Sequence, residues 1–214
     1  MCNEYRRMSI FDRMLAKDST ETERSAGPSL LVGLGNPGPE YERTRHNAGA
    51  LTVEAIAGEL GGNYWKTMGS MLVCECRYQG KRIWLARSRR YMNEHGKPVK
   101  ALLGQLGLQP DDLLVVHDEL DLPPATLRLK QGGGHAGHRG VASVIEAIGP
   151  DFARLRIGIG HPPGQMPADR FVLQEMKGEI WEEFRASLDR AVPIALDCIA
   201  DGVLAAMNRF NGEA

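Results

Sequence analysis

Two patterns of apolar and polar positions alternate along the chain from residue 30 onward. Short apolar or alternating runs predict β-strands, and apolar residues spaced three and four apart predict amphipathic helices. The predicted strands are residues 30–33, 71–78, 82–86, 113–116, 126–130 and 155–159. The predicted helices are residues 48–60, 96–106, 141–148 and 179–208. We expect Pro193 to kink or split the last helix, because proline interrupts the backbone hydrogen-bond ladder.

This alternation predicts one α/β domain, in which helices cover both faces of a mixed, mostly parallel sheet to give a three-layer αβα architecture. The domain is expected to span residues 30–214, a length that one hydrophobic core can serve. Residues 1–29 mix charges with Ser and Thr and lack a sustained period, so we expect a flexible N-terminal extension there.

Composition narrows the class of protein. The 26 Lys and Arg nearly balance the 27 Asp and Glu, so a nucleic acid would have to be met by a local basic patch. The four cysteines include no C-x-x-C pair, which argues against a zinc knuckle or disulfide scaffold and favours a reducing, cytoplasmic compartment. No apolar run reaches the roughly 18 residues of a membrane span, so we expect a soluble protein.

The loop after the first predicted strand matches G-x-G-x-x-G from Gly33 to Gly38, the fingerprint of a dinucleotide site. That interpretation requires a helix to begin at the third glycine, but Pro37 and Pro39 flank this glycine. The acidic residue expected about 20 positions further on would be Glu54, which falls inside a predicted helix. We therefore expect no nucleotide cofactor.

Polar clusters follow several of the predicted strands. They are residues 36–46, 91–93, 117–119 and 132–139. Ligands of open α/β sheets bind beyond the carboxyl ends of the strands, so we expect all four clusters to meet at one edge of the sheet.

His46 and Asp118 form the simplest catalytic pair in these clusters. A carboxylate on one imidazole nitrogen fixes the tautomer and raises the basicity of the other, so this histidine could activate water. No serine or cysteine lies in a nucleophile-elbow context, which favours direct attack by water. The alternative is structural: His46 would cap the next helix, and Asp118 would form a turn.

Asn36 and Asn93 each offer an amide donor and a carbonyl acceptor for a peptide-like group or a developing oxyanion. Asn36 precedes a proline, so it could equally form a turn. His135 and His138 in the glycine-rich loop invite a metal interpretation. No third ligand stands at a recognisable offset, and we expect no metal.

Cations alternate on two predicted strands, Arg128 with Lys130 and Arg154 with Arg156. Alternate residues of a strand share one face, so these pairs could clamp phosphates of a nucleic-acid backbone. The alternative is an ordinary solvated face balanced by acidic residues.

Several motifs occur together in one order. They are GLGNPG at 33–38, Tyr41, TRHN at 44–47, YMN at 91–93, HDELDLP at 117–123, GGGH at 132–135 and LRIGIGHP at 155–162. In this combination the chain resembles bacterial-type peptidyl-tRNA hydrolase over residues 30–210. The resemblance implies an α/β hydrolase that cleaves the ester between a nascent peptide and the 3′ ribose of tRNA in translation and ribosome rescue. It also implies a monomer with no metal, cofactor or obligate protein partner.

Residue roles follow from the same resemblance. His46 resembles the base that activates water, and Asp118 resembles the acid that keeps this base effective. Asn36 resembles the asparagine that distinguishes an N-blocked peptidyl ester from a free aminoacyl ester. Asn93 resembles the asparagine that binds the substrate end. Tyr41 and Tyr91 resemble residues that line the tRNA-end site, and Lys130 and Arg156 resemble a clamp on the tRNA 5′ phosphate.

Some positions depart from the family pattern. Arg139 replaces the usual asparagine, and its longer side chain could reach a phosphate instead. Ser88-Arg89-Arg90 stands where the family commonly has Pro-x-Thr, and His95 stands in place of a serine. These departures leave a second interpretation open, a non-catalytic RNA-binding relative that serves organellar RNA processing.

Overall fold

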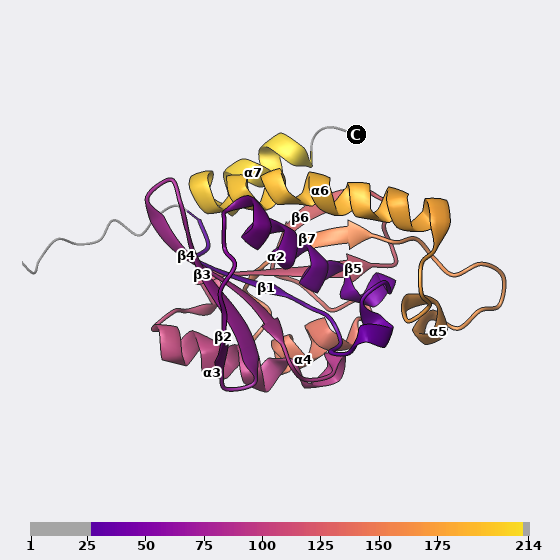
Figure 1. The fold of residues 1–214 in the computed structure, drawn as a ribbon, viewed down its shortest axis with the longest axis horizontal. Helices are drawn as coiled ribbons and strands as arrows, with labels where there is room; N and C mark the ends of the chain where they lie inside the picture. The colour runs from indigo at the N-terminus through magenta and orange to yellow at the C-terminus, as the bar shows by residue number, and fades with distance from the viewer. Residues whose placement is uncertain (1–26, 212–214) are drawn as a thin grey trace, which may run out of the picture.

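The computed structural model describes residues 27–211 and is built around one seven-stranded sheet (Figure 1). Most of the predicted N-terminal extension, residues 1–26, lies outside the described residues, as do residues 212–214. The described chain enters the sheet at Ser29, whose N–H donates to the carbonyl of Asp112 at 2.9 Å.

The strands lie in the order β2-β3-β4-β1-β5-β7-β6. Their bounds are β1 Leu30–Gly33, β2 Trp65–Met68, β3 Met71–Tyr78, β4 Lys81–Ser88, β5 Leu113–Glu119, β6 Leu127–Gln131 and β7 Ala153–Gly158. The α-helices are α2 Ala48–Glu59, α3 Gly96–Leu106, α4 Arg139–Ile148, α5 Ala168–Val172, α6 Gly178–Asp201 and α7 Val203–Phe210.

The centre of the sheet is parallel and its edges are antiparallel. Strands β4, β1, β5 and β7 run in one direction, and β3, β2 and β6 are added by antiparallel pairing. Every residue of β1 and β5 is buried. Such strands read as continuous apolar runs because helices cover both of their faces. The predicted class, a three-layer α/β fold with a mixed sheet, is confirmed.

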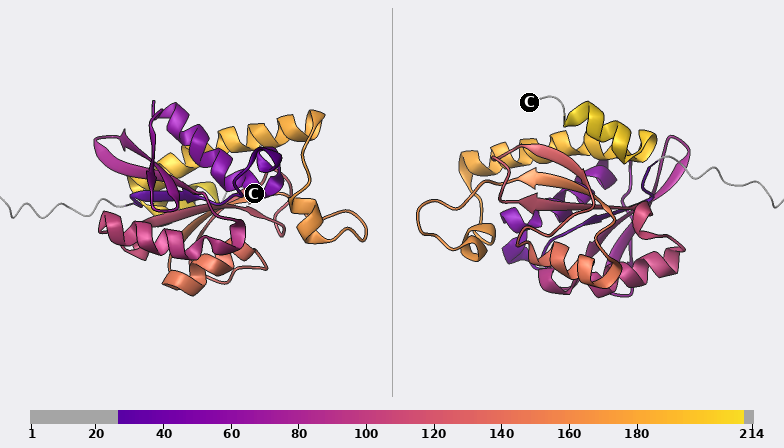
Figure 2. Two further views of the ribbon diagram at one scale, coloured as in Figure 1. Left: turned by 60° about the horizontal axis from the view of Figure 1, so that its bottom comes forward. Right: turned by 180° about the vertical axis from the view of Figure 1, so that it is seen from behind.

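Helices α2, α6 and α7 cover one face of the sheet, and α3 and α4 cover the other (Figure 1, Figure 2). Successive side chains of a strand point to opposite faces, so β1 contributes to both cores. Leu31 packs in the core that includes α2 and α6, and Leu30 packs in the core that includes α3 and α4. Both faces are therefore filled by apolar side chains, and polar side chains are left to the rim where the strands end.

Two glycines bring the start of α2 against the ends of β1 and β5. A Cβ atom on Gly49 would overlap the carbonyl oxygen of Val116, and a Cβ atom on Gly33 would overlap the carbonyl oxygen of Gly49. The N–H of Ala50 donates to the carbonyl of Leu34 at 3.0 Å. The turn that precedes α2 is thereby held over the end of β5.

The last helix differs from the prediction at its proline. Helix α6 continues through Pro193 to Asp201, and Gly202, with a φ of 89°, separates it from α7. Proline removes one backbone hydrogen bond, but the neighbouring Val192 and Ile194 are buried in the core and hold the helix in place. Of the two outcomes expected at Pro193, a kink or a split, the split is wrong, because the chain breaks at Gly202, a glycine with positive φ, instead.

Three further elements differ from the sequence-based expectation. The sequence does not predict strand β2, because its residues WKTM form neither an apolar run nor a regular alternation, and it does not predict helix α5, because five residues are too few to show a helical period. Strand β6 runs antiparallel to β7, with Gln131 opposite Ala153. The glycine-rich loop therefore leaves the sheet at the end opposite the rim, and its second half, residues 136–139, returns to the rim where α4 begins. The expectation that all four polar clusters meet at the rim therefore holds for only the second half of this loop, because β6 does not end there.

Candidate active site

Two side chains far apart in the sequence meet at the rim. The Nδ1 atom of His46 lies 3.0 and 3.1 Å from the two carboxylate oxygens of Asp118. His46 lies in the 3-10 turn Arg45–Asn47 before α2, and Asp118 is next to last in β5. The helix-capping alternative for His46 is wrong, since no side-chain cap forms at the start of α2 and the imidazole contacts the carboxylate.

Asp118 is an ionised group in a buried place. Its side chain is 3 % exposed. Burial by itself raises the pKa of a carboxyl group, but the charges and hydrogen bonds of His46 and His138 outweigh it and hold the pKa of Asp118 well below its usual range. The carboxylate accepts the Nδ1–H of His46, so the lone pair of this histidine is on Nε2, the nitrogen that Asp118 leaves free. His46 lines the adjoining cleft.

His138 completes the cluster around the carboxylate. Its Nε2 lies 3.0 Å from an oxygen of Asp118, and its Nδ1 accepts the backbone N–H groups of Gly140 (3.1 Å) and Val141 (3.2 Å) at the start of α4. A nitrogen that accepts two N–H groups carries no proton, so the proton of His138 is on Nε2 and is donated to Asp118. A second proton on Nδ1 would break the helix cap. Only His46 can therefore gain a proton while the cap stays intact.

The same three residues place possible metal ligands within 4.8 Å of one another. A metal would need a bare Nε2 on His138, but the helix amides force the proton onto that nitrogen. The carboxylate and the two imidazoles are already joined by hydrogen bonds of 3.0 Å. The arrangement therefore fits a proton-transfer site better than a metal centre.

Asn36 joins two loops of the rim. Its Oδ1 accepts the backbone N–H of Met92 at 2.8 Å, while its Nδ2 has no protein acceptor among the described residues. Asn47 holds the backbone of Asn36 through two hydrogen bonds, of 2.8 Å to its N–H and 3.0 Å to its carbonyl. An amide with an occupied oxygen and a free NH₂ group suits a ligand that accepts hydrogen bonds, such as a carbonyl or an oxyanion.

A cleft of about 600 Å³ opens beside these groups. The predicted site residues that line it are Asn36, Tyr41, His46, Tyr91, Asn93, Asp118 and Arg139. Tyr41 and Tyr91 stand edge to face, with ring centroids 6.4 Å apart and an interplanar angle of 82°. Tyr91 is 53 % exposed, so one aromatic surface remains open to a planar ligand.

Lys130 and Arg156 do not line the cleft; they lie on the β6/β7 edge of the sheet. Arg156 lies 3.7 Å from Glu119 and is 22 % exposed. Arg154 is buried, and its guanidinium donates to two carbonyl oxygens of the glycine-rich loop. The interpretation of Arg154 and Arg156 as paired phosphate ligands is therefore wrong for Arg154, which holds the loop instead.

Asn47 and His138 also belong to the site, although the sequence analysis assigns neither residue a hydrogen-bonding role there. For His138 a signal existed, since a polar residue directly before a helix is a capping signal. Asn47 carries no such signal, because its partner Asn36 lies 11 residues away across a loop.

The fold and the site together define an α/β enzyme of the hydrolase class, with an imidazole and a carboxylate paired at the rim of a mixed sheet. Residues 30–214 match the family model described as peptidyl-tRNA hydrolase. The chain belongs to the peptidyl-tRNA hydrolase family, as the motifs predict.

Individual relatives agree with this assignment. The chain is 45 % identical to the peptidyl-tRNA hydrolase of Nocardia farcinica over 186 residues, which is 85 % of this chain and 91 % of the relative. It is 43 % identical to that of Marinobacter nauticus over 186 residues, 85 % of this chain and 94 % of the relative. The crystal structure of peptidyl-tRNA hydrolase from Acinetobacter baumannii superposes with a TM-score of 0.81 at 37 % identity, covering 87 % of this chain and 96 % of that one. Within residues 27–211, no helix has the length and apolar character needed to cross a membrane.

Proposed function

We propose that this protein hydrolyses the ester bond between a peptide and the 3′-terminal ribose of tRNA, releasing free peptide and free tRNA. Family membership and the named relatives support this reaction. The observation that carries the mechanism is the hydrogen bond between His46 Nδ1 and Asp118, because it leaves a base, His46 Nε2, at the cleft.

Water is the nucleophile in this mechanism. His46 Nε2 takes a proton from a water molecule while the water oxygen attacks the ester carbonyl, and a tetrahedral oxyanion forms. The free amide of Asn36 and the amide of Asn93 donate hydrogen bonds to the peptidyl end and its oxyanion. Protonated His46 then returns the proton to the ribose oxygen as the ester C–O bond breaks. General-base catalysis of this kind contributes about 10²- to 10⁴-fold in rate.

Asp118 and His138 confine the proton transfer to one histidine. While His46 carries the proton, the ionised Asp118 balances its charge from 3.0 Å away. His138 keeps its proton on Nε2, because its Nδ1 accepts the amides that open α4. We infer that the hydrogen bond from His138 to Asp118 weakens the electrostatic interaction between this carboxylate and protonated His46.

The described cysteines give no support to a covalent intermediate. Cys74, Cys76 and Cys198 are buried. Burial raises the pKa of Cys76 and of Cys198 to about 12, so these thiols stay protonated and unreactive at neutral pH.

Separate groups are proposed for binding tRNA. Tyr41 and Tyr91 would stack on a base of the 3′ end, and Arg139 would pair with a phosphate there. Lys130 and Arg156 would clamp the 5′ phosphate from the β6/β7 edge.

The non-catalytic RNA-binding alternative has one observation in its favour, which is Arg139 at the cleft in place of an amide. The enzyme is better supported, because a protein that only binds RNA has no need for a buried carboxylate aligned on an imidazole. We further propose a monomer that works in the cytoplasm. The unpaired described cysteines support a reducing compartment, and light scattering of the purified protein tests the monomer.

The proposal is tested by hydrolysis of N-acetyl-aminoacyl-tRNA beside the same tRNA with a free amino group. We expect cleavage of the blocked substrate and loss of at least about 10²-fold in kcat/KM with His46→Ala. His161→Ala is the matched control, because His161 is 69 % exposed and also pairs with a carboxylate, that of Asp121. A His46→Ala protein as fast as the parent would rule out the mechanism.

A further inference from the structure

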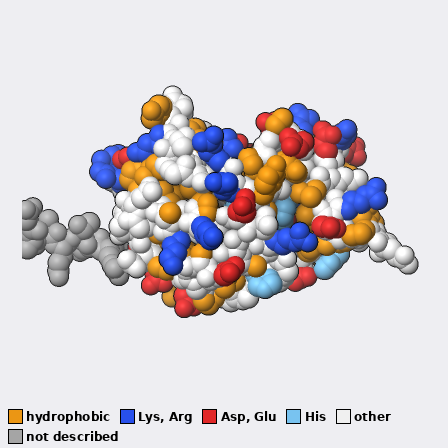
Figure 3. Space-filling view, turned by 90° about the horizontal axis from the view of Figure 1, so that it is seen from below, with side chains coloured by type: hydrophobic (Ala, Val, Ile, Leu, Met, Phe, Trp, Pro, Cys, Tyr) orange, Lys and Arg blue, Asp and Glu red, His pale blue; other side chains and the backbone are white. Residues whose placement is uncertain are grey.

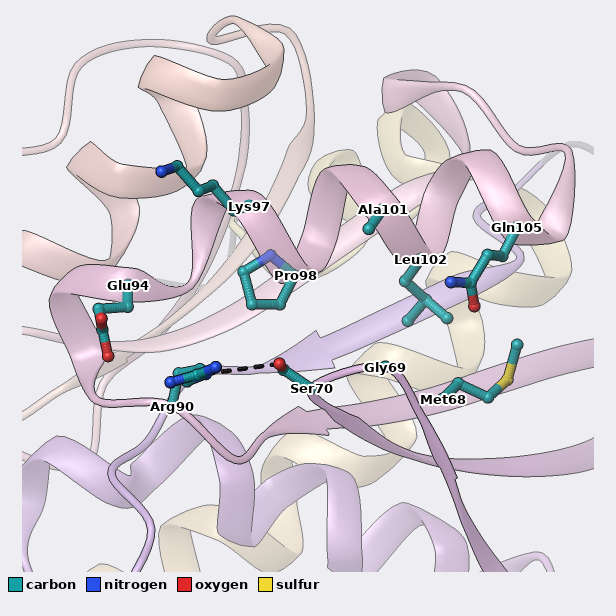
Figure 4. A pocket seen from close by; sticks show the side chains of 10 residues that line it. All are labelled: Met68, Gly69, Ser70, Arg90, Glu94, Lys97, Pro98, Ala101, Leu102 and Gln105. Atoms are coloured by element: carbon teal, nitrogen blue, oxygen red, sulfur yellow. Dashed lines mark hydrogen bonds between the residues drawn. The ribbon is translucent and has the colours of Figure 1, made fainter.

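The side of the molecule that carries α3 and α4 presents Lys and Arg side chains among hydrophobic ones (Figure 3). On it, a groove of about 400 Å³ runs between the turn that joins β2 to β3 and helix α3 (Figure 4). Arg90 and Lys97 lie at one end of the groove. Met68 and Leu102 lie toward the other end, so the groove has a cationic end and an apolar end.

The cations of the groove are not neutralised by the protein. The Nε of Arg90 reaches only the hydroxyl of Ser70, at 3.4 Å. Among residues 27–211, neither Arg90 nor Lys97 forms an ion pair, and the nearby Glu94 forms none either. Two positive charges against one negative charge leave this end able to attract an anionic group.

The groove and the active-site cleft share one wall. Tyr91, Met92 and Asn93 line the cleft, while the flanking Arg90 and Glu94 line the groove. The fully buried ring of His95 holds residues 90–95 in a compact turn, since its Nε2 donates to the carbonyl of Arg90 at 3.2 Å. A chain leaving the cleft past Asn93 therefore meets the cationic end of the groove.

The order of the strands indicates which part of the substrate lies on this side. Lys130 and Arg156, the proposed phosphate clamp, are on β6 and β7 at one edge of the sheet. His46 and Asp118 lie over β1 and β5 at the centre, and the groove is at the β2/β3 edge. The ester joins tRNA to peptide, so with tRNA on the β6/β7 side the peptide extends toward the groove.

We propose that this groove is a subsite for the nascent peptide and that it favours peptides with acidic side chains just before the esterified residue. A cleft of about 600 Å³ is the size of a site for one small molecule, so it holds the tRNA end and the first residue while further residues lie outside. Acidic side chains would meet Arg90 and Lys97, and apolar ones would lie against Met68 and Leu102. This inference rests on the proposed hydrolase function.

The test compares kcat/KM for acetyl-Ala-tRNA with that for acetyl-X-X-Ala-tRNA, where X is Asp, Ala or Lys. We expect the parent to prefer Asp over Lys by about three- to tenfold, the effect of partly exposed ion pairs, with a smaller preference at high salt. The double variant Arg90→Glu/Lys97→Glu should reverse the preference and leave acetyl-Ala-tRNA unchanged. Lys100→Glu is the control for a charge reversal on the same helix, since Lys100 is exposed on α3 but does not line the groove.

Each other outcome has a definite meaning. No Asp/Lys preference in the parent, or an unchanged preference in the double variant, rejects the groove while leaving the hydrolase function intact. An equal loss for every substrate, including acetyl-Ala-tRNA, shows that the cations contact tRNA and overturns the peptide subsite. Failure of the parent to cleave acetyl-Ala-tRNA rejects the hydrolase function and this inference with it.

Discussion

Asp118 accepts hydrogen bonds from two imidazoles that differ in what holds their second nitrogen. His138 is bound to the start of α4, whereas the second nitrogen of His46 is free of protein hydrogen bonds in the described structure. This asymmetry decides which histidine can act as a base. It also predicts opposite effects for two substitutions.

Asp118→Asn should lower kcat/KM by about 10²- to 10⁴-fold, because the amide cannot balance the charge on protonated His46. Without the carboxylate the protonated imidazole is less stable, so the acid limb of the pH profile of kcat/KM should move to lower pH. Asp121→Asn is the control, since Asp121 also pairs with a histidine but is 64 % exposed. An unmoved acid limb would show that the two groups are not coupled.

His138→Asn should keep the fold and lower kcat/KM by about tenfold. Asparagine is a good helix cap, but it is too short to reach Asp118 from the start of α4. The carboxylate would then act on His46 alone, so the acid limb should move to higher pH, opposite to Asp118→Asn. The control is His135→Asn, because His135 is exposed in the same loop and bonds only to a backbone N–H, that of Gly137. A shift to lower pH, or none, contradicts the role given to His138.

At the scale of elements, the distance between His46 and Asp118 depends on how closely α2 approaches β5. Gly49→Ala places a methyl group on the carbonyl of Val116, so it should lower the free energy of unfolding by about 1–3 kcal/mol and reduce kcat/KM. Gly58→Ala in the same helix meets nothing within 4 Å and should raise the free energy of unfolding by about 0.5–1 kcal/mol. Urea unfolding and kcat/KM of both variants check this. If Gly49→Ala behaves like Gly58→Ala, the close approach does not position the site.

At the scale of the whole molecule, buried histidines set the stability in acid. Burial lowers the pKa of His95 to about 4 and that of His117 to about 3. In the unfolded chain both take up protons near pH 6.5, so unfolding gains protons and stability falls as pH drops. We expect a loss of about 1.4 kcal/mol per pH unit for each histidine between about pH 6 and pH 4. Asp118, whose pKa is lowered in the fold, adds to the loss below about pH 4.

Urea unfolding at pH 7, 6 and 5 measures this slope. His95→Gln should reduce this slope of stability with pH by the contribution of one histidine. His161→Gln, at an exposed position, should leave the slope unchanged. A slope that His95→Gln does not alter would mean that His95 takes up its proton in the folded state as well.

The sequence by itself determined the class of fold and the identity of the central pair. The apolar patterns that predict strands and helices depend only on residues close together in the sequence. The predicted bounds of the elements at residues 30–33, 71–78 and 96–106 therefore agree with the structure. The motifs singled out His46 and Asp118, although they lie 72 residues apart. The predicted split at Pro193 failed because burial of its neighbours, which no local pattern records, outweighed one lost hydrogen bond.

Only the tertiary structure decided which Arg and His side chains form hydrogen bonds that hold the fold together. Arg154 and Arg156 look alike as alternate residues of a strand, but one is buried under the glycine-rich loop and the other remains partly exposed. His138 becomes a fixed hydrogen-bond donor to Asp118 because β6 runs antiparallel and its loop crosses back to the rim. Strand order also places the groove on the opposite side of the site from the proposed clamp. Order, direction and burial arise from contacts between distant segments, and a local sequence pattern does not encode these.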